Sequence, residues 1–387
     1  MRPYARMILL SRGRCFCQTS DPGLSSLCPP CFAAQGIFMH WYDFLKRLVT
    51  LRGKAPSDTQ ALQDADDDRL IVFLRAQDDP LQFASIEREI RNGFHLFHWM
   101  DGSRHHGDRR EAGSVSLARR PELANAFIFH GDGRVREVAL KVLDGAITLP
   151  VVFYGLVSRL NDWSPEVRAA ARQTFARCFD KTSIEVLLPA VWVLLINSRH
   201  WLRWAGTNDF REAVMERRDL VEALVNRLVS EKRSKAGGVF GIVCQSRHVD
   251  PLLPFLAVHA SQPHIRAIAV NYLSAAYVRF PLGTWSRQWV DKSAGMFRMV
   301  PDMGERSVGG YDVSSVVACA LGDRANAVRK EALDAVIRHR RDPGFQPLIV
   351  RCLKELSGDP KPSIQFRLEY LQRMLAEETQ QGLGTDG

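Results

Sequence analysis

Histidine and aspartate side chains that could bind a metal ion are concentrated in FHLFHWMDGSRHHGDRRE, residues 94 to 111. His95 and His98 are three residues apart, so on a helix they would share a face and could ligate one ion with Asp101 or His105. The polar, glycine-containing stretch that follows is typical of an exposed loop. A metal-dependent enzyme or lyase-like accessory protein is therefore one hypothesis, and a solvated loop is the alternative.

Four cysteines are crowded into the start of the chain, at Cys15, Cys17, Cys28 and Cys31. Thiolates in this number could bind zinc, but their spacing matches no zinc ribbon or knuckle. The segment also has no apolar run long enough for a signal-peptide core. We expect residues 1–38 to be a disordered leader or a wrongly assigned start, with translation beginning at Met39. An unrecognised targeting segment is the alternative.

A third cluster lies in RHWLRWAGTNDFRE, residues 199 to 212. Aromatic and guanidinium groups together can hold nucleic acid, and they also dominate many protein contacts. The three-residue spacing of the two tryptophans is equally that of ordinary helix packing, so core packing is the competing interpretation. The candidate binding residues are Trp201, Arg203, Trp204, Arg233 and Arg266.

The rest of the sequence offers little catalytic chemistry. It contains no Gly-rich phosphate loop, no G-x-S-x-G elbow and no convincing Cys/His nucleophile pair. We therefore predict no cofactor and favour a non-enzymatic protein. The net charge is +9, and 42 of the 52 basic residues are arginines. This balance permits attraction to nucleic acid or acidic proteins, although GC-rich coding is the preferred explanation of the arginine usage.

The apolar segments and the remaining cysteines indicate where in the cell the protein is expected. The most apolar run, IEVLLPAVWVLLIN at residues 184–197, is too short to span a bilayer and contains Pro189, which favours a buried helix. Cys178, Cys244, Cys319 and Cys352 are scattered singly in apolar patterns and are expected to be buried. We therefore predict no membrane span and a reducing, cytoplasmic setting.

A repeated unit organises most of the chain. Each copy has a turn, an aliphatic residue followed by arginine, a small residue three positions later and a large apolar residue four further on. The clear copies have Arg136, Arg168, Arg266 and Arg329, followed by Ala139, Ala171, Ala269 and Ala332. Weaker copies at Leu202–Arg203, Lys232–Arg233 and Phe297–Arg298 complete a series in which arginine returns every 30 to 35 residues.

Each repeated helix is accompanied by a second apolar segment. Aspartate and proline occupy the joining turns, where they begin and end helices. Because one helix pair cannot bury its own apolar face, stacking of successive pairs is required. The companion segments are residues 149–160, 184–196, 219–229, 250–260, 312–321 and 345–356.

This pattern resembles the short HEAT repeats common in bacterial proteins, over about residues 120–375. The resemblance implies an all-α fold, an α-solenoid of antiparallel helix pairs in which the second helix of each pair lines the concave side. It also implies that recurrent aspartates and arginines bond between successive repeats. The resulting structural ladder would contain Asp132, Arg136, Asp162, Arg168, Asp323 and Arg329; an arginine stripe that binds a ligand is the alternative.

Departures from the repeat define the expected domain boundaries. Residues 39–118 form an irregular helical N-terminal cap, 119–375 the HEAT-like solenoid and 376–387 a disordered tail. The segment 299–310, with three glycines and a proline, is expected to be an inserted loop.

Three functional hypotheses follow. The leading one is a scaffold that engages a protein partner through the concave face of the solenoid. The second is a nucleic-acid binder or a protein of the HEAT-like DNA-glycosylase type with a basic concave surface, although no stretch matches the motif of that family. The third is the metal-dependent enzyme or accessory protein at His95 and His98.

Overall fold

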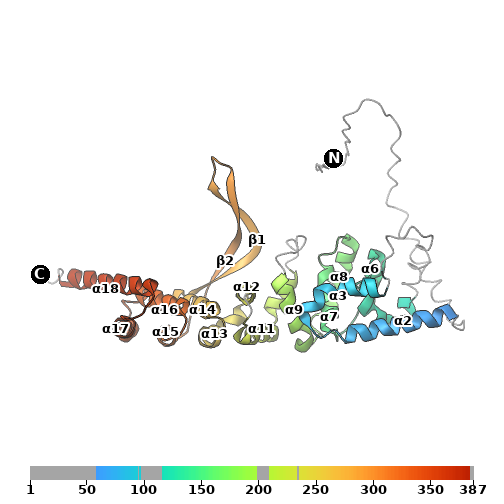
Figure 1. Ribbon diagram of the computed structural model, residues 1–387, viewed down its shortest axis with the longest axis horizontal. Coiled ribbons are helices and arrows are strands. Elements are labelled where there is room, and N and C mark those ends of the chain that lie inside the picture. The colour runs from blue at the N-terminus through green and yellow to red at the C-terminus, as the bar shows by residue number, and fades with distance from the viewer. Residues whose placement is uncertain (1–57, 95, 97–115, 198–208, 233–234, 384–387) are drawn as a thin grey trace, which may run out of the picture. The chain divides into compact units, whose positions relative to one another are not determined.

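The computed structural model describes residues 58–94, 96, 116–197, 209–232 and 235–383 (Figure 1). This part of the chain is mostly helical and contains one two-stranded sheet. Several predicted site residues lie outside the described residues: the four N-terminal cysteines, His95, His98, Trp201, Arg203, Trp204 and Arg233.

The helices follow one another closely. Those before residue 200 are α2 (Asp58–Arg75), α3 (Phe83–Gly93), α5 (Ala124–Phe127), α6 (Gly133–Val142), α7 (Pro150–Arg159), α8 (Pro165–Cys178) and α9 (Ile184–Asn197). Next come α10 (Asp209–Glu216), α11 (Arg218–Ser230), α12 (Ala236–Val243), α13 (Leu253–His259) and α14 (Pro263–Ala275). The last four are α15 (Val313–Leu321), α16 (Asn326–Arg338), α17 (Gln346–Glu355) and α18 (Pro362–Leu383). Short 3-10 helices lie at Pro80–Gln82, Pro121–Leu123, Arg247–Leu252 and Pro343–Phe345.

Local sequence explains where these helices begin. The carboxylate of Asp132 accepts a hydrogen bond from the backbone N–H of Arg134 and caps α6. The hydroxyl of Ser164 accepts one from Val167 N–H at the start of α8, directly before Pro165. Both caps satisfy backbone donors that a helix leaves unpaired at its first turn, and proline lacks such a donor.

Helices two elements apart pack against one another. The arginine-bearing helices pair as α6 with α8, α14 with α16, and α16 with α18. The companion helices pair as α7 with α9, α9 with α11, α11 with α13, α13 with α15, and α15 with α17. The small residues of the repeat, Ala139, Ala171, Ala269 and Ala332, are fully buried in the core, as close approach of helices requires.

A long antiparallel hairpin interrupts the helices between α14 and α15. Its strands are β1 (Tyr277–Asp291) and β2 (Met296–Ser307), paired from Tyr277 opposite Ser307 to Asp291 opposite Met296. The prediction of a loop over 299–310 is therefore wrong for most of that segment, and so is the weak repeat copy at Phe297–Arg298, because these residues lie on β2. The all-α expectation is correct for the helices and misses this hairpin.

Two further expectations need correction. The predicted tail 376–387 begins too early, because α18 continues to Leu383 and Glu378 forms ion pairs with Arg340 and Arg341. Residues 384–387 lie outside the described residues. Cys319 is exposed, whereas Cys178, Cys244 and Cys352 are buried as expected.

Candidate functional site

Buried guanidinium–carboxylate pairs connect one arginine-bearing helix to the interhelical turn that precedes the next helix of the series. Nε and Nη2 of Arg136 donate to the two carboxylate oxygens of Asp162 at 3.0 and 2.9 Å. Nη1 of Arg136 donates to the backbone carbonyls of His130 and Gly131 in its own turn. Asp162 also accepts from the backbone N–H of Ser164. The side chains of Arg136 and Asp162 are 1% and 2% exposed, so their charges neutralise each other away from water.

The same arrangement returns in the C-terminal half. Arg266 donates to both oxygens of Asp323 at 2.7 and 2.9 Å and to the carbonyl of Ala260. Arg329 donates to Asp359 at 2.9 Å and to the carbonyl of Asp323. At the end of the series, the amide of Gln365 donates to three backbone carbonyls, including that of Asp359. Each of these guanidinium groups thus links the turn before its own helix to the turn before the next helix of the series.

The structure places the predicted ladder residues as follows. The carboxylate partner of Arg136 is Asp162, and Asp132 caps α6. Arg168 donates to the backbone carbonyls of Asp162 and Trp163. Arg266, a candidate binding residue, is 5% exposed and belongs to this set of internal pairs, so its guanidinium is not presented to a ligand.

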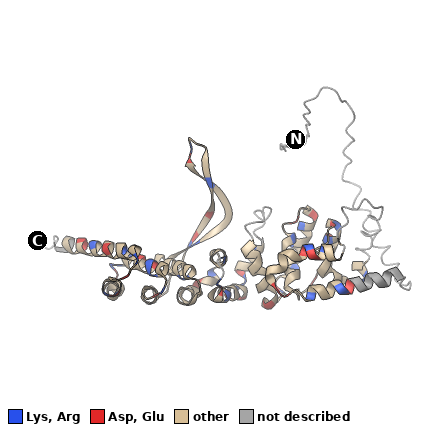
Figure 2. Cartoon of the chain, viewed as in Figure 1, with Lys and Arg blue, Asp and Glu red and all other residues tan. Residues whose placement is uncertain are grey.

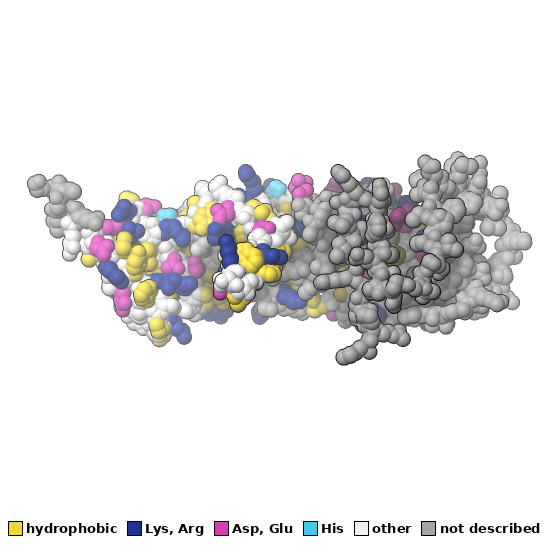
Figure 3. All heavy atoms as spheres, turned by 90° about the horizontal axis from the view of Figure 1, so that it is seen from above, with side chains coloured by type: hydrophobic (Ala, Val, Ile, Leu, Met, Phe, Trp, Pro, Cys, Tyr) yellow, Lys and Arg dark blue, Asp and Glu magenta, His cyan; other side chains and the backbone are white. Residues whose placement is uncertain are grey.

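The hairpin presents the largest group of neighbouring exposed apolar side chains among the described residues. Figure 1 shows it extending away from the helices at its base, and Figure 3 shows hydrophobic and basic side chains gathered where it points toward the viewer. Residues that pair directly across an antiparallel ladder project to the same face. The register therefore defines an outer face made of Trp285, Arg287, Trp289, Phe297, Met299 and Pro301.

Side-chain geometry on the outer face agrees with this register. The rings of Trp289 and Phe297 meet edge to face, 5.7 Å between centroids. The guanidinium carbon of Arg287 lies 4.2 Å from the ring centroid of Phe297. Trp285 and Met299 are each 51% exposed, and Trp289 and Phe297 are 44% and 45% exposed. The other face carries Ser286, Gln288, Arg298 and Val300, of which Arg298 donates to Gln288.

An ion pair and a buried apolar side chain help to fix the base of the hairpin to the helices. Arg306 donates to both carboxylate oxygens of Asp250, at 2.6 and 2.5 Å, and to the backbone carbonyls of Cys244 and Ser246. Val278, which pairs with Arg306 across the ladder, is fully buried. Arg306 thus makes from a strand the type of contact that Arg136 makes from a helix.

A buried arginine lies against the irregular part of β1. Arg211 of α10 donates to the carbonyl of Pro281 at 3.3 Å, and its side chain is mostly buried. Desolvation by this burial lowers the pKa of Arg211. Gly283 has φ +88°, and a Cβ there would collide with Nη1 of Arg211. Only glycine therefore fits this bulge comfortably.

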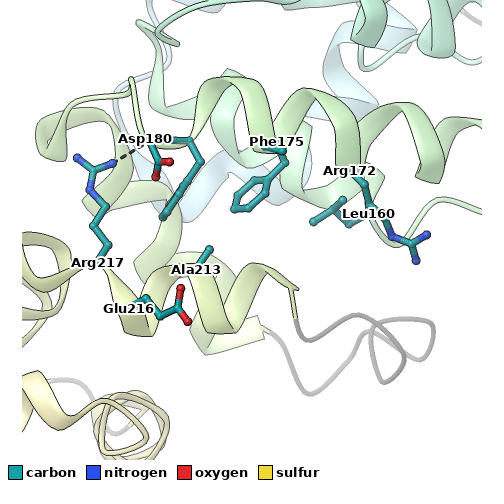
Figure 4. A pocket seen from close by; sticks show the side chains of 9 residues that line it. Leu160, Arg172, Phe175, Asp180, Ala213, Glu216 and Arg217 are labelled. Carbon is teal, nitrogen blue, oxygen red and sulfur yellow. Dashed lines mark hydrogen bonds between the residues drawn. The ribbon is translucent and has the colours of Figure 1, made fainter.

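The pocket in Figure 4 lies between α8 and α10 and has a volume of about 500 Å³. Phe175 and Phe179 line it from α8 and the residue that follows α8, beside Glu216. Arg217 lies at the edge of the pocket and donates to the carbonyls of Phe179 and Thr182. The guanidinium of Arg217 is therefore already hydrogen-bonded within the protein. The described lining residues include no histidine, cysteine or serine, so they do not form a nucleophile with an adjacent base.

Neither a metal-binding cluster nor a membrane-spanning helix occurs in the described part of the chain; the candidate ligands His95 and His98 are not in that part. No group of three or more histidine, cysteine, aspartate or glutamate side chains there could hold a metal ion. None of the helices described is both long and apolar enough to cross a membrane. The outer face was missed at the sequence level, although the alternation of Trp285, Arg287 and Trp289 is the period-two signal of a strand.

No family model matches the sequence, and no curated protein matches it.

Proposed function

We propose that this chain is a HEAT-like α-solenoid that serves as a non-enzymatic scaffold and binds a protein partner. The solenoid is supported by the regular packing of helices two elements apart and by the arginine–aspartate pairs between successive turns. Stacks of this kind bury one continuous core while exposing a long surface. Free thiols at the buried Cys178, Cys244 and Cys352 support a reducing, cytoplasmic setting.

The observation that carries the proposed binding function is the outer face of the hairpin. Tryptophan, phenylalanine, methionine and arginine are the residue types enriched at the centres of protein interfaces. Neighbouring exposed apolar side chains of this kind mark interaction sites on folded proteins. We therefore place the main contact on the outer face rather than on the concave surface that the resemblance implied.

Nucleic-acid binding is less well supported by the same side chains. Phosphate recognition requires several cations on one surface, and Arg287 is the only basic residue on the outer face. Arg136, Arg266, Arg306 and Arg329 are committed to internal carboxylates. Figure 2 shows basic and acidic residues interspersed along the described helices.

Site-specific photo-crosslinking tests the proposal. A photoreactive phenylalanine analogue replaces Phe297 on the outer face or, as the matched control, Val300 on the opposite face, in cells that make the protein. We expect a discrete protein adduct from position 297 that is absent at position 300, resists nuclease, and disappears when Trp285 and Trp289 are both alanine. Adducts of equal yield at both positions, or none at either, would refute binding through the outer face; a nuclease-sensitive adduct would favour nucleic acid.

A further inference from the structure

We infer that the outer face recognises an acidic protein segment, in which a central carboxylate binds Arg287 and flanking apolar side chains cover Trp285 and Trp289. This inference rests on the proposed function, because it names the chemistry of the partner at the same surface.

Arg287 lies in the middle of the apolar cluster. Trp285 and Trp289 are two residues away on each side along β1, and Met299 is directly opposite on β2. The guanidinium carbon of Arg287 is 4.2 Å from the ring centroid of Phe297 and 5.7 Å from that of Trp289. A guanidinium that contacts a ring with its flat side keeps the N–H donors at its edge available.

No carboxylate among the described residues forms an ion pair with Arg287. Two other hairpin arginines do have such partners: Arg279 pairs with Glu305, and Arg306 pairs with Asp250. Arg298, on the opposite face, donates instead to Gln288. The two remaining hairpin carboxylates are also engaged. Asp291 accepts from Ser293 and from the backbone N–H of Ala294 in the turn, which lowers its pKa.

Asp302, the second of these carboxylates, lies beside the hydroxyl groups of Thr284 and Ser286, which lower its pKa. Neither it nor Asp291 is an ion-pair partner of Arg287, so the charge at the centre of the outer face remains uncompensated within the described hairpin.

The charge of Arg287 favours a partner that carries a carboxylate over a purely apolar partner. A purely apolar partner that covered the outer face would strip water from the guanidinium without replacing its hydrogen bonds, which is costly. A carboxylate offers two coplanar acceptors that match the guanidinium edge, so the same burial becomes favourable. Lys292 and Arg298 lie close by at the turn and on the opposite face, where they would attract an acidic segment without being buried with it.

Peptide selection against the full chain tests this inference. A random library of 12-residue displayed peptides is selected on the wild-type protein, and the binding of individual synthetic peptides is then measured by fluorescence anisotropy. We expect selected peptides to contain Asp or Glu between apolar residues. Arg287→Glu should weaken binding about tenfold or more and Arg287→Lys by less, because lysine keeps the charge and loses the paired donors. Arg298→Glu on the opposite face is the matched control and should change affinity less than about threefold.

The outcomes separate the inference from the proposed function. Peptides that lose binding to the Trp285→Ala/Trp289→Ala variant but show no acidic residue, or that tolerate Arg287→Glu, overturn the acidic-segment inference and leave the binding function intact. Peptides that bind that double variant as well as wild type count against both. Single-stranded DNA or anionic phospholipid vesicles that bind the outer face more tightly than every selected peptide would overturn the inference in favour of phosphate.

Discussion

The helical repeats and the hairpin use the same side chain in opposite ways. In the helices, Arg136 and Arg266 are buried and hold the carboxylate of a neighbouring turn. On the hairpin, Arg287 is exposed and lies over an aromatic ring without a described ion-pair partner. An arginine-rich composition therefore does not define a basic binding surface by itself. What matters is whether a carboxylate of the same chain has already neutralised the guanidinium.

The two regions should also respond differently to mutation. A buried ion pair adds little net stability, because desolvation offsets most of the attraction, but removal of one partner leaves a buried charge unpaired. An exposed arginine on an exposed aromatic ring adds little and costs little to remove. Changes in the helical pairs should therefore alter folding, and changes on the outer face should alter binding.

The largest expected effect is that of Arg136→Ala. It leaves the carboxylate of Asp162 buried with only the 3.3 Å contact from Arg159 and the N–H of Ser164. We expect a loss of about 3 kcal/mol in the free energy of unfolding, measured by urea denaturation. Arg298→Ala is the control and should cost less than about 0.5 kcal/mol. Equal losses in the two variants would remove the distinction between the regions.

The next largest effect is expected at the base of the hairpin. Arg306→Ala removes charge-assisted hydrogen bonds to Asp250 and two backbone acceptors, which together should cost about 2 kcal/mol. Because this arginine fixes the strands to the helices, amide exchange should accelerate in β1 and β2 more than in α16. Uniform acceleration throughout the chain would show instead that the hairpin and the helices unfold as one unit.

The sequence predicted the helices well because their signal is local. Periodic apolar residues, aspartate and proline turns and buried alanines all lie within one repeat. The partner of Arg136 is not local, because Asp162 is 26 residues away along the chain. Arg306 has no local signal in the sequence, because its role depends on a strand returning to Asp250.

The hairpin was missed for a related reason. Phe297 and Arg298 occurred at the spacing expected of another repeat, so the period across repeats outweighed the local alternation. Glycine and proline in the segment 299–310 then favoured a loop. In the structure Pro301 is compatible with a strand at the edge of a two-stranded sheet, and Gly304 leaves space for the ring of Phe280.

Arg211 should give an effect of opposite sign. It is buried, donates one long hydrogen bond to Pro281, and has no described carboxylate partner. Arg211→Met keeps the apolar stem and removes the desolvated charge, so the free energy of unfolding should stay equal or rise by about 1 kcal/mol. A loss as large as that of Arg136→Ala would mean that Arg211 is as well compensated as the helical pairs.

A smaller, pH-dependent effect is expected at Asp323. Burial would raise its pKa, but the hydrogen bond from Arg266 and that from the backbone N–H of Ala325 lower it overall. An unfolded aspartate has a pKa of about 3.9. The ionised Asp323 carboxylate therefore stabilises the folded state fully above that pH. This stabilisation is lost as the pH falls through the lower pKa that Asp323 has in the folded state.

Urea midpoints for wild type and Asp323→Asn, followed from pH 7 to pH 2.5, measure this contribution. The two proteins should differ by a constant amount above about pH 5 and converge in acid, since protonated aspartate resembles asparagine. A difference that persists undiminished at the lowest pH would show that the charge of Asp323 is not what stabilises the fold.

The smallest effect on folding, and the sharpest separation from binding, is expected for Trp285→Ala and Trp289→Ala. Both side chains are about half exposed, and neither belongs to the buried core, so each change should alter the free energy of unfolding by less than about 0.5 kcal/mol. Thermal denaturation checks this, with Trp192→Ala as the buried contrast, for which a loss of about 3 kcal/mol or more is expected. A large loss of stability from the hairpin tryptophans would mean that they support the fold. Near-neutral stability combined with loss of the crosslinked partner would instead assign the two tryptophans to binding. Exposed tryptophans that do not stabilise the fold become favourable only when a partner covers them.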